Sequence, residues 1–281
     1  MKKKAVLIGI NRHRIAGADL RGCVNDVKNM KSLLTRSYGF KSKDVTVITD
    51  FAATKKRIES AIQKLVREGR KGDVLLIHYS GHGSNVPDDN GDEADRRDEI
   101  LCPTDLDWKA PLRDDWLRKT FDTLRAGVSL TVITDCCHSG TITRAVEPPD
   151  APSIERYLPS PWDLVAVESG RGLRGTVKTE LRKSKRPSRK KRDVVEIDLP
   201  EVLITGCRFD QTSADAWIGE SFNGALTYNL VAVIADAKGE LSYRKLHADT
   251  STKLKRGRFD QVPQLEGAKS RLDRPFLSPL D

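Results

Sequence analysis

The chain has 281 residues, of which 38% are hydrophobic and 32% charged, a composition that is typical of globular proteins rather than of disordered or membrane-bound ones. Its longest apolar runs have the length of strands and fall far short of the ~20 residues that a membrane-spanning helix needs. The net charge of +9 would suit a nucleic-acid-binding surface. However, residues 171–192 hold eleven Lys and Arg against one Glu, a balance of +10, so the rest of the chain carries −1. Because the basicity belongs to one segment, we do not expect nucleic acid to be a partner.

The five cysteines are odd in number and irregularly spaced, so they do not form a disulfide framework. The sequence opens with Met-Lys-Lys-Lys, but the apolar run at residues 5–10 is too short for the core of a signal peptide. We therefore expect free thiols, a cytoplasmic location and no membrane partner.

In the first half of the chain, short apolar runs alternate with segments of helical periodicity. The runs at residues 5–10, 45–49, 73–79 and 129–134 predict buried strands, and the segments at 25–36, 54–68 and 112–124 predict helices. Apolar strands that alternate with helices are typical of a mostly parallel sheet covered on both faces. The predicted fold class is therefore α/β.

The pattern changes at residue 147. From there to residue 200, Pro, Ser, Gly and the basic run replace it, which predicts a long, partly disordered linker. Regular structure resumes with a strand at 202–205 and helices at 222–235 and 242–254. We divide the chain into a large catalytic portion (1–146), the linker (147–200) and a small portion (201–281).

Two predicted strands end in residues that are able to do chemistry. Ser80-Gly-His-Gly83 follows one, and Asp135-Cys-Cys-His-Ser-Gly140 follows the other. Parallel strands present their carboxyl ends at one edge of a sheet, where ligands bind. A histidine there could activate a thiol for attack on a carbonyl carbon. The backbone amides of Gly83 and Cys137 are the candidates for an oxyanion hole.

Each residue also has a simpler interpretation. A lone histidine at a strand end is usually structural, and a lone cysteine usually packs as a small hydrophobic residue. The pair is more specific, because His82 precedes Cys137 by 55 residues and each follows its own apolar strand. In caspases the histidine lies about 50 residues before the cysteine.

The two segments resemble the signature segments of the metacaspases, cysteine peptidases of the caspase clan. The resemblance extends to residues 22–26, 91–99, 205–215, 222–228 and 263–267, so it covers almost all of the chain outside 147–200. It implies a caspase-like three-layer α/β/α sandwich in which both portions share one sheet. It also implies a dyad of Cys137, the second cysteine of its segment, and His82, which needs no cofactor.

Carboxylates are expected beside the cysteine. Asp135 lies two residues before it and Asp26 follows the first strand, and two carboxylates would bind an arginine side chain. The alternative for Asp26 is a helix N-cap. The S1 pocket of a peptidase binds the side chain before the scissile bond. In the metacaspases the positions that match it are Cys23, Asp26, Ser80 and Asp135, which implies protein or peptide substrates cleaved after Arg or Lys.

Nine carboxylates between residues 88 and 107 offer the oxygen ligands that Ca²⁺ prefers. By resemblance to calcium-dependent metacaspases, the ligands would be Asp98, Asp114 and Asp115. The family's further carboxylate after the nucleophile is missing, since the sequence there reads Thr141-Ile-Thr-Arg144. The alternative is a solvated acidic loop, with two of these residues favouring a helix N-terminus.

The basic segment is the candidate for control. An extended chain rich in Arg and Lys suits an enzyme that cuts after those residues, so we predict self-cleavage there. The candidate positions are Arg182, Lys183, Lys185, Arg186, Arg189, Lys190, Lys191 and Arg192. The alternatives are a solvated loop, or a patch that binds RNA or an acidic regulatory partner.

The sequence thus predicts a cysteine endopeptidase that cleaves after basic residues. The alternative from another class is a caspase-fold scaffold whose basic loop recruits nucleic acid or an acidic protein. The presence of both His82 and Cys137 argues against it. A third option is a caspase-fold hydrolase of different specificity.

Overall fold

A computed structural model describes residues 1–88, 91, 96–138, 153–168, 193–208, 211–237 and 241–280. Its centre is a seven-stranded sheet in the order β2-β1-β3-β7-β10-β13-β9. The bounds are β1 Lys3–Gly9, β2 Val45–Thr49, β3 Val74–Ser80, β7 Ser129–Asp135, β10 Glu201–Thr205, β13 Gln264–Gly267 and β9 Val194–Glu196. The first five strands of this order run parallel, β13 is antiparallel to β10, and β9 is parallel to β13.

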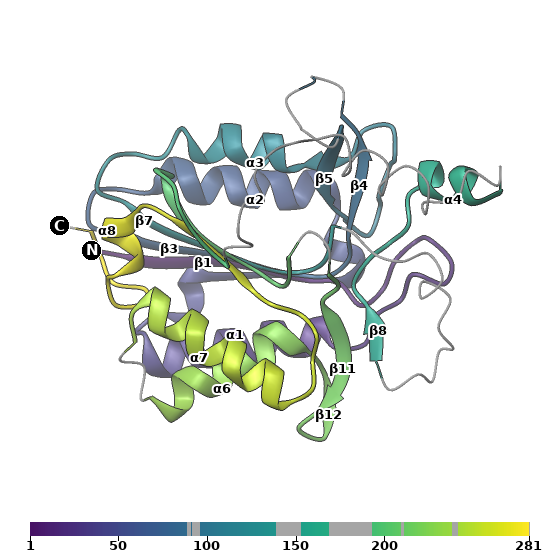
Figure 1. Ribbon diagram of the computed structural model, residues 1–281. Helices are drawn as coiled ribbons and strands as arrows, with labels where there is room; N and C mark the ends of the chain where they lie inside the picture. The colour runs from purple at the N-terminus through teal and green to yellow at the C-terminus, as the bar shows by residue number, and fades with distance from the viewer. Residues whose placement is uncertain are drawn as a thin grey trace, which may run out of the picture.

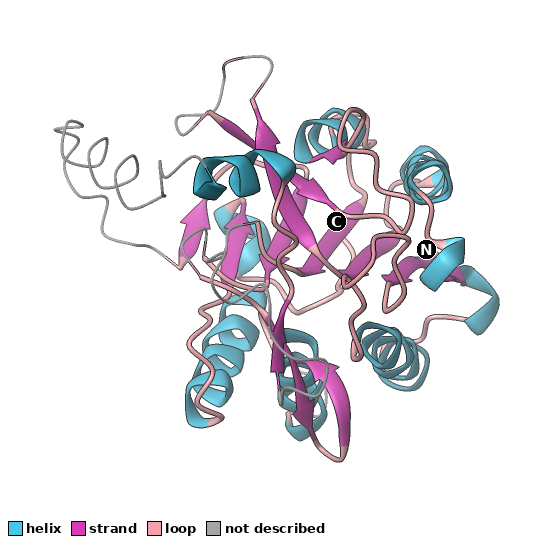
Figure 2. Cartoon of the chain, turned by 90° about the vertical axis from the view of Figure 1, so that its right-hand side faces the viewer, coloured by secondary structure: helices cyan, strands magenta, loops and turns pink. Residues whose placement is uncertain are grey.

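Helices cover both faces of the sheet (Figure 1). One face carries α1 (Cys23–Ser37), α6 (Ala225–Asp236) and α7 (Tyr243–Arg256), and the other carries α2 (Lys55–Glu68) and α3 (Asp114–Phe121). Figure 2 looks along several of these helices and shows them on either side of the strands. Successive residues of β1 point to opposite faces, so Leu7 belongs to one apolar cluster and Ile8 to the other. The predicted three-layer α/β/α sandwich is confirmed.

Two small antiparallel sheets lie at the end of the central sheet where β3 and β7 finish (Figure 1). One contains β4 (Gly83–Pro87), β5 (Arg97–Leu101) and β6 (Leu112–Arg113). The other contains β8 (Ser153–Glu155), β11 (Ala214–Ile218) and β12 (Ser221–Gly224). The remaining elements are α4 (Pro161–Glu168), α8 (Lys269–Leu272) and the short 3-10 turns η1 (Ser42–Asp44) and η2 (Asp50–Ala52). No helix among the described residues is long and apolar enough to cross a membrane.

Two predicted helices begin later than expected, because strand pairing takes their first residues. Leu112 pairs with Leu101 in the β5–β6 ladder, so α3 begins at Asp114. Phe222 pairs with Trp217 in the β11–β12 ladder, so α6 begins at Ala225. Inside the predicted linker, the described residues form β8, α4 and β9, and the basic run at 171–192 lies outside the described residues.

Candidate active site

The predicted nucleophile, Cys137, lies two residues beyond the end of β7. Ser80 and Asp135 are register partners, so β3 and β7 end level with each other and their following loops lie together. Cys137 is fully buried, and its Sγ accepts a hydrogen bond from the Ser213 amide. The thiol packs against Tyr157 and Cys207.

The predicted partner, His82, lies in the turn between β3 and β4. Its Nε2 is 3.0 Å from the carbonyl oxygen of Ala18. A carbonyl only accepts, so Nε2 carries the proton and Nδ1 is left as the basic nitrogen. Burial, together with the neighbouring His13, lowers the pKa of His82 to about 3 against the smaller effect of the Ala18 carbonyl. The ring is therefore neutral at physiological pH.

The two predicted oxyanion-hole amides converge on one oxygen. Gly83 N and Cys137 N both donate to the carbonyl oxygen of Arg156, at 3.0 and 3.2 Å. A glycine is needed at the first position, because a Cβ there would lie 2.2 Å from the carbonyl oxygen of Cys137. Two amides that share one oxygen beside a thiol have the arrangement that stabilises a tetrahedral intermediate.

The four residues predicted for the S1 pocket also come together. All are buried, and they come from α1 and from the ends of β3 and β7; they are Cys23, Asp26, Ser80 and Asp135. Ser80 Oγ donates to Asp26 Oδ2 at 2.7 Å, and Asp26 also accepts the Gly224 amide at 2.9 Å. Asp26 lies in the first turn of α1, whose N-cap is Gly22, so the capping alternative is wrong.

Asp135 is held by the small portion of the chain. Its Oδ1 accepts from Ser213 Oγ at 2.6 Å, and its Oδ2 accepts from the amide and hydroxyl of Thr227, both at 2.8 Å. These contacts join β7 to residues far along the chain. The pocket is therefore complete only when both portions are folded together.

Sequence reasoning missed two residues of this site, Arg156 and Asp215. Arg156 is fully buried, with Nη2 2.8 Å from Asp26 Oδ2 and Nη1 3.3 Å from Asp135 Oδ1. Asp215 adds a third carboxylate, 3.5 Å from Nη2. Two signals were present: Arg156 is the only basic residue between Arg144 and Arg171, and Asp215 ends the segment 205–215 that carries the family resemblance.

Comparison with known proteins identifies the family. The sequence model of the metacaspase peptidase C14 domain matches residues 3–145. The chain is 33% identical to Metacaspase-1 of Meyerozyma guilliermondii, over 95% of this chain and 70% of that protein. It is 34% identical to Metacaspase-1A of Aspergillus niger, over 94% of this chain and 70% of that protein. The chain belongs to the metacaspase family.

Two solved structures share the fold. A protein of Geobacter sulfurreducens superposes with a TM-score of 0.70 and 29% identity over 100% of both chains. Caspase-1 of Spodoptera frugiperda superposes with a TM-score of 0.57 over 96% of this chain and 92% of that one; at 15% identity it shows the fold alone. The metacaspase is thus a cysteine-type peptidase with a caspase-like fold, and its substrates are proteins or peptides.

The buried carboxylates around Arg156 need a cation. Burial raises the pKa of Asp26 to about 7 against the lowering effect of Arg156, and the neighbouring Asp135 raises it further. Three buried carboxylates surround a single guanidinium, so the site keeps an excess of negative charge. Removing the cation would leave that charge without compensation in a medium where it costs several kcal/mol.

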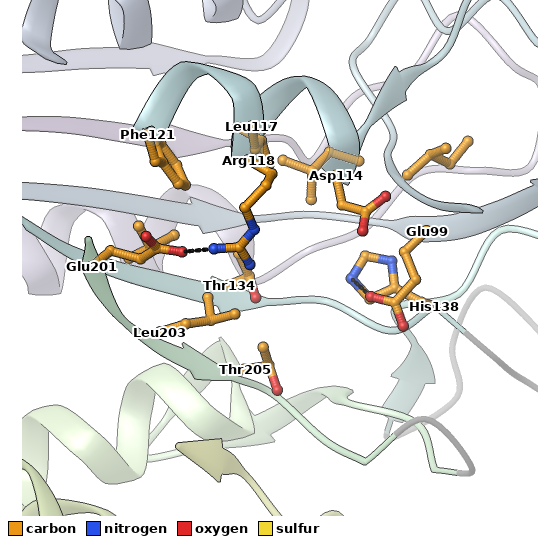
Figure 3. Close-up of a pocket in the computed structure, with 13 residues that line it drawn as sticks. Glu99, Asp114, Leu117, Arg118, Phe121, Thr134, His138, Glu201, Leu203 and Thr205 are labelled. Atoms are coloured by element: carbon orange, nitrogen blue, oxygen red, sulfur yellow. Dashed lines mark hydrogen bonds and ion pairs between the residues drawn. The ribbon is translucent and has the colours of Figure 1, made fainter. Parts of the chain in front are cut away.

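The three predicted calcium ligands do not converge. Asp98 is buried and paired with Arg113, and Asp115 lies 3.5 Å from Lys119. Asp114 lines a cavity of about 90 Å³ with Glu99 and His138 (Figure 3), and burial raises the pKa of its carboxyl. Within the described ranges no group of three or more His, Cys, Asp or Glu side chains is placed to hold a metal ion, so these residues do not fit Ca²⁺ as they lie.

A buried histidine next to the site gives a prediction about stability. Burial lowers the pKa of His13 from 6.5 to about 4, against the opposing charges of Asp19 and Asp50, and its ring lies 5.2 Å from that of His82. In the unfolded chain His13 binds a proton near pH 6.5, whereas in the folded chain it does so only near pH 4. The contribution of His13 to the free energy of unfolding is therefore fully present above pH 6.5 and is lost as the pH falls toward 4. At pH 5 the loss is about 2 kcal/mol.

Replacing His13 by Gln removes this titration. In a Cys137→Ala background, which lacks the predicted nucleophile, the difference in unfolding free energy between pH 8 and pH 5 should shrink by about 2 kcal/mol. Urea unfolding at the two pH values measures it. An unchanged difference would show that His13 titrates alike in both states.

Proposed function

We propose that this metacaspase is an endopeptidase that cleaves after Arg or Lys with a dyad of Cys137 and His82. The observation that carries the proposal is the guanidinium of Arg156, buried between Asp26 and Asp135. The same residue places its carbonyl oxygen on the amides of Gly83 and Cys137. A pocket that accepts a guanidinium while it polarises the following carbonyl is built for cleavage after arginine.

The reaction then follows from the groups present. His82 Nδ1 takes the thiol proton, and the Sγ thiolate of Cys137 attacks the carbonyl carbon. The Gly83 and Cys137 amides stabilise the oxyanion. The imidazolium then returns the proton to the leaving amine, and water hydrolyses the thioester. The Nε2–H bond to Ala18 keeps the ring in the tautomer that each transfer requires.

Cleavage after Arg or Lys would also allow the enzyme to cut its own chain, because residues 171–192 are rich in both. The predicted cleavage positions between Arg182 and Arg192 lie outside the described residues, so self-processing there is a proposal that rests on the sequence. The alternative, a caspase-fold scaffold, places its binding function in the same segment. A scaffold needs no working dyad, so substitution of the dyad separates the peptidase hypothesis from the scaffold hypothesis.

Substitution of either member of the dyad should abolish hydrolysis. Cys137→Ala removes the attacking sulfur and His82→Ala removes the base, whereas Cys136→Ala, the matched control one residue away, should keep most of the activity. The measurement is the release of a fluorophore placed after Arg in a peptide. Residual wild-type turnover in Cys137→Ala would refute the nucleophile, and inactivity of the wild-type chain itself would favour the scaffold.

Specificity should follow the charge of the pocket. A peptide with Arg or Lys before the scissile bond should be cut far faster than its Asp counterpart, because Asp would face three buried carboxylates. Asp26→Asn should lower kcat/KM for the Arg peptide about 10- to 150-fold, the effect of losing one charged hydrogen bond of about 1.5–3 kcal/mol. A preference for Asp would overturn the pocket assignment.

Calcium binding by Asp98, Asp114 and Asp115 is a separate proposal, and it requires Arg113 to release Asp98. A ligand that binds only the folded state raises its melting temperature. Millimolar Ca²⁺ should therefore raise the melting temperature of Cys137→Ala protein relative to chelator, and Asp114→Asn should remove the increase. Equal melting temperatures in calcium and chelator would refute a calcium site at these residues.

A further inference from the structure

The segment that contains Arg156 crosses the active site in extended form. Its first part is β8, which pairs antiparallel with β11 through Ser153↔Ala216 and Glu155↔Ala214. The Arg156 amide then donates to the Ser213 carbonyl at 2.9 Å. Paired main chains are the usual way in which a protein holds an extended peptide at a sheet edge.

The main chain is also held beyond Arg156. The Leu158 amide donates to the Gly83 carbonyl at 3.0 Å, and Ser84 Oγ donates to the Leu158 carbonyl at 2.5 Å. Tyr157 packs against Cys137. The peptide bond between Arg156 and Tyr157 is therefore fixed from both sides beside the nucleophile.

We propose that Ser153–Leu158 is bound as this metacaspase's own substrate, with Arg156 in the S1 pocket and Arg156–Tyr157 as the scissile bond, and that the uncut segment blocks the site. The inference rests on the proposed function and names its first substrate. It also moves the decisive cleavage upstream of the basic run at 171–192.

A purely structural ion pair would explain only part of this arrangement. Such a pair uses the guanidinium alone, whereas here the carbonyl of the same residue also accepts from the amide of the predicted nucleophile. The guanidinium is imperfectly satisfied, since Arg156 Nε has no hydrogen-bond partner among the described residues. Any buried carbonyl needs hydrogen-bond donors, but here both donors are the amides predicted for the oxyanion hole, and the guanidinium of the same residue lies among the predicted S1 carboxylates.

The chemical step balances without any co-reactant except water. Cys137 Sγ forms a bond to the carbonyl carbon of Arg156, and the bond from that carbon to the Tyr157 nitrogen breaks. The proton taken by His82 goes to the Tyr157 nitrogen, which becomes a new N-terminus. One water then hydrolyses the thioester, which leaves a carboxylate on Arg156 and restores the thiol.

The position of the cut decides whether the site opens. A cut within 182–192 leaves Ser153–Leu158 attached to the large portion on one side and undisturbed in the site. A cut after Arg156 breaks the peptide bond that joins Arg156 to Tyr157. The chain from Tyr157 onward is then no longer tied to the residue in the S1 pocket. The two fragments, 1–156 and 157–281, stay together because β7 and β10 are neighbours in one sheet.

The first test maps the cleavage. Purified wild-type protein should give a fragment that begins at Tyr157, found by N-terminal sequencing and mass spectrometry, and Cys137→Ala should not. Arg156→Lys should still be cut, Arg156→Gln should not be cut at this bond, and Arg171→Gln, the matched control at the next basic residue, should be cut as the wild type is. Hydrolysis of an Arg peptide in trans should show a lag that matches the appearance of the Tyr157 end.

Because Arg156→Gln leaves three buried carboxylates without a cation and so destabilises the fold, a second measurement uses peptides. The cut enzyme should cleave Ser-Ile-Glu-Arg-Tyr-Leu between Arg and Tyr, and the same peptide with Gln in place of Arg at least about tenfold more slowly. Full activity on Arg peptides, without a lag and with the Arg156–Tyr157 bond intact, would overturn this inference and leave the proposed function standing. Failure of every form of the enzyme to cleave any Arg peptide would overturn both.

Discussion

Three buried carboxylates that need one cation are the constraint on which this structure depends. Asp26 and Asp135 come from the large portion and Asp215 from the small one, and none of them is exposed. An uncompensated buried charge typically costs 3–5 kcal/mol, which is a large share of the stability of a domain. The folded chain therefore cannot keep this pocket dry and empty. It fills the pocket with Arg156 from its own sequence, and any other occupant must bring a positive charge of its own.

The parallel sheet places the reacting groups around that cluster. Because β1, β3 and β7 pair in register, Gly9, Ser80 and Asp135 lie level at one edge. The chain leaves this edge through α1, which carries Asp26, through the turn that carries His82, and through Cys137. The small portion provides β11, which pairs antiparallel with β8 and so holds the extended segment that leads to Arg156. Asp215 of β11 adds the third carboxylate near the guanidinium.

The strands and the chemical motifs could be predicted because they are local. Continuous apolar runs predict β1, β3 and β7, and short motifs at the ends of these strands point to His82, Cys137 and two carboxylates. The β4–β5 pair and β11 were missed because each strand has only five residues and no long apolar run, and each gains its conformation from pairing with another short strand. Arg156 was missed for a similar reason: its neighbours are typical of a linker, and only the folded site shows what its side chain and carbonyl contact.

Under the proposed function, specificity and latency have one origin in this site. The tethered segment presents Arg156 to the pocket at an effective concentration that reaches millimolar for short linkers, so a free peptide must compete with a ligand that never diffuses away. Every added carboxylate that sharpens selection of basic substrates also tightens the hold on the chain's own arginine. A metacaspase with so acidic a pocket therefore cannot be both highly selective and active while the bond after Arg156 is intact. Hydrolysis of that bond resolves the conflict, because it turns the tethered competitor into a product whose new chain ends are free to move apart.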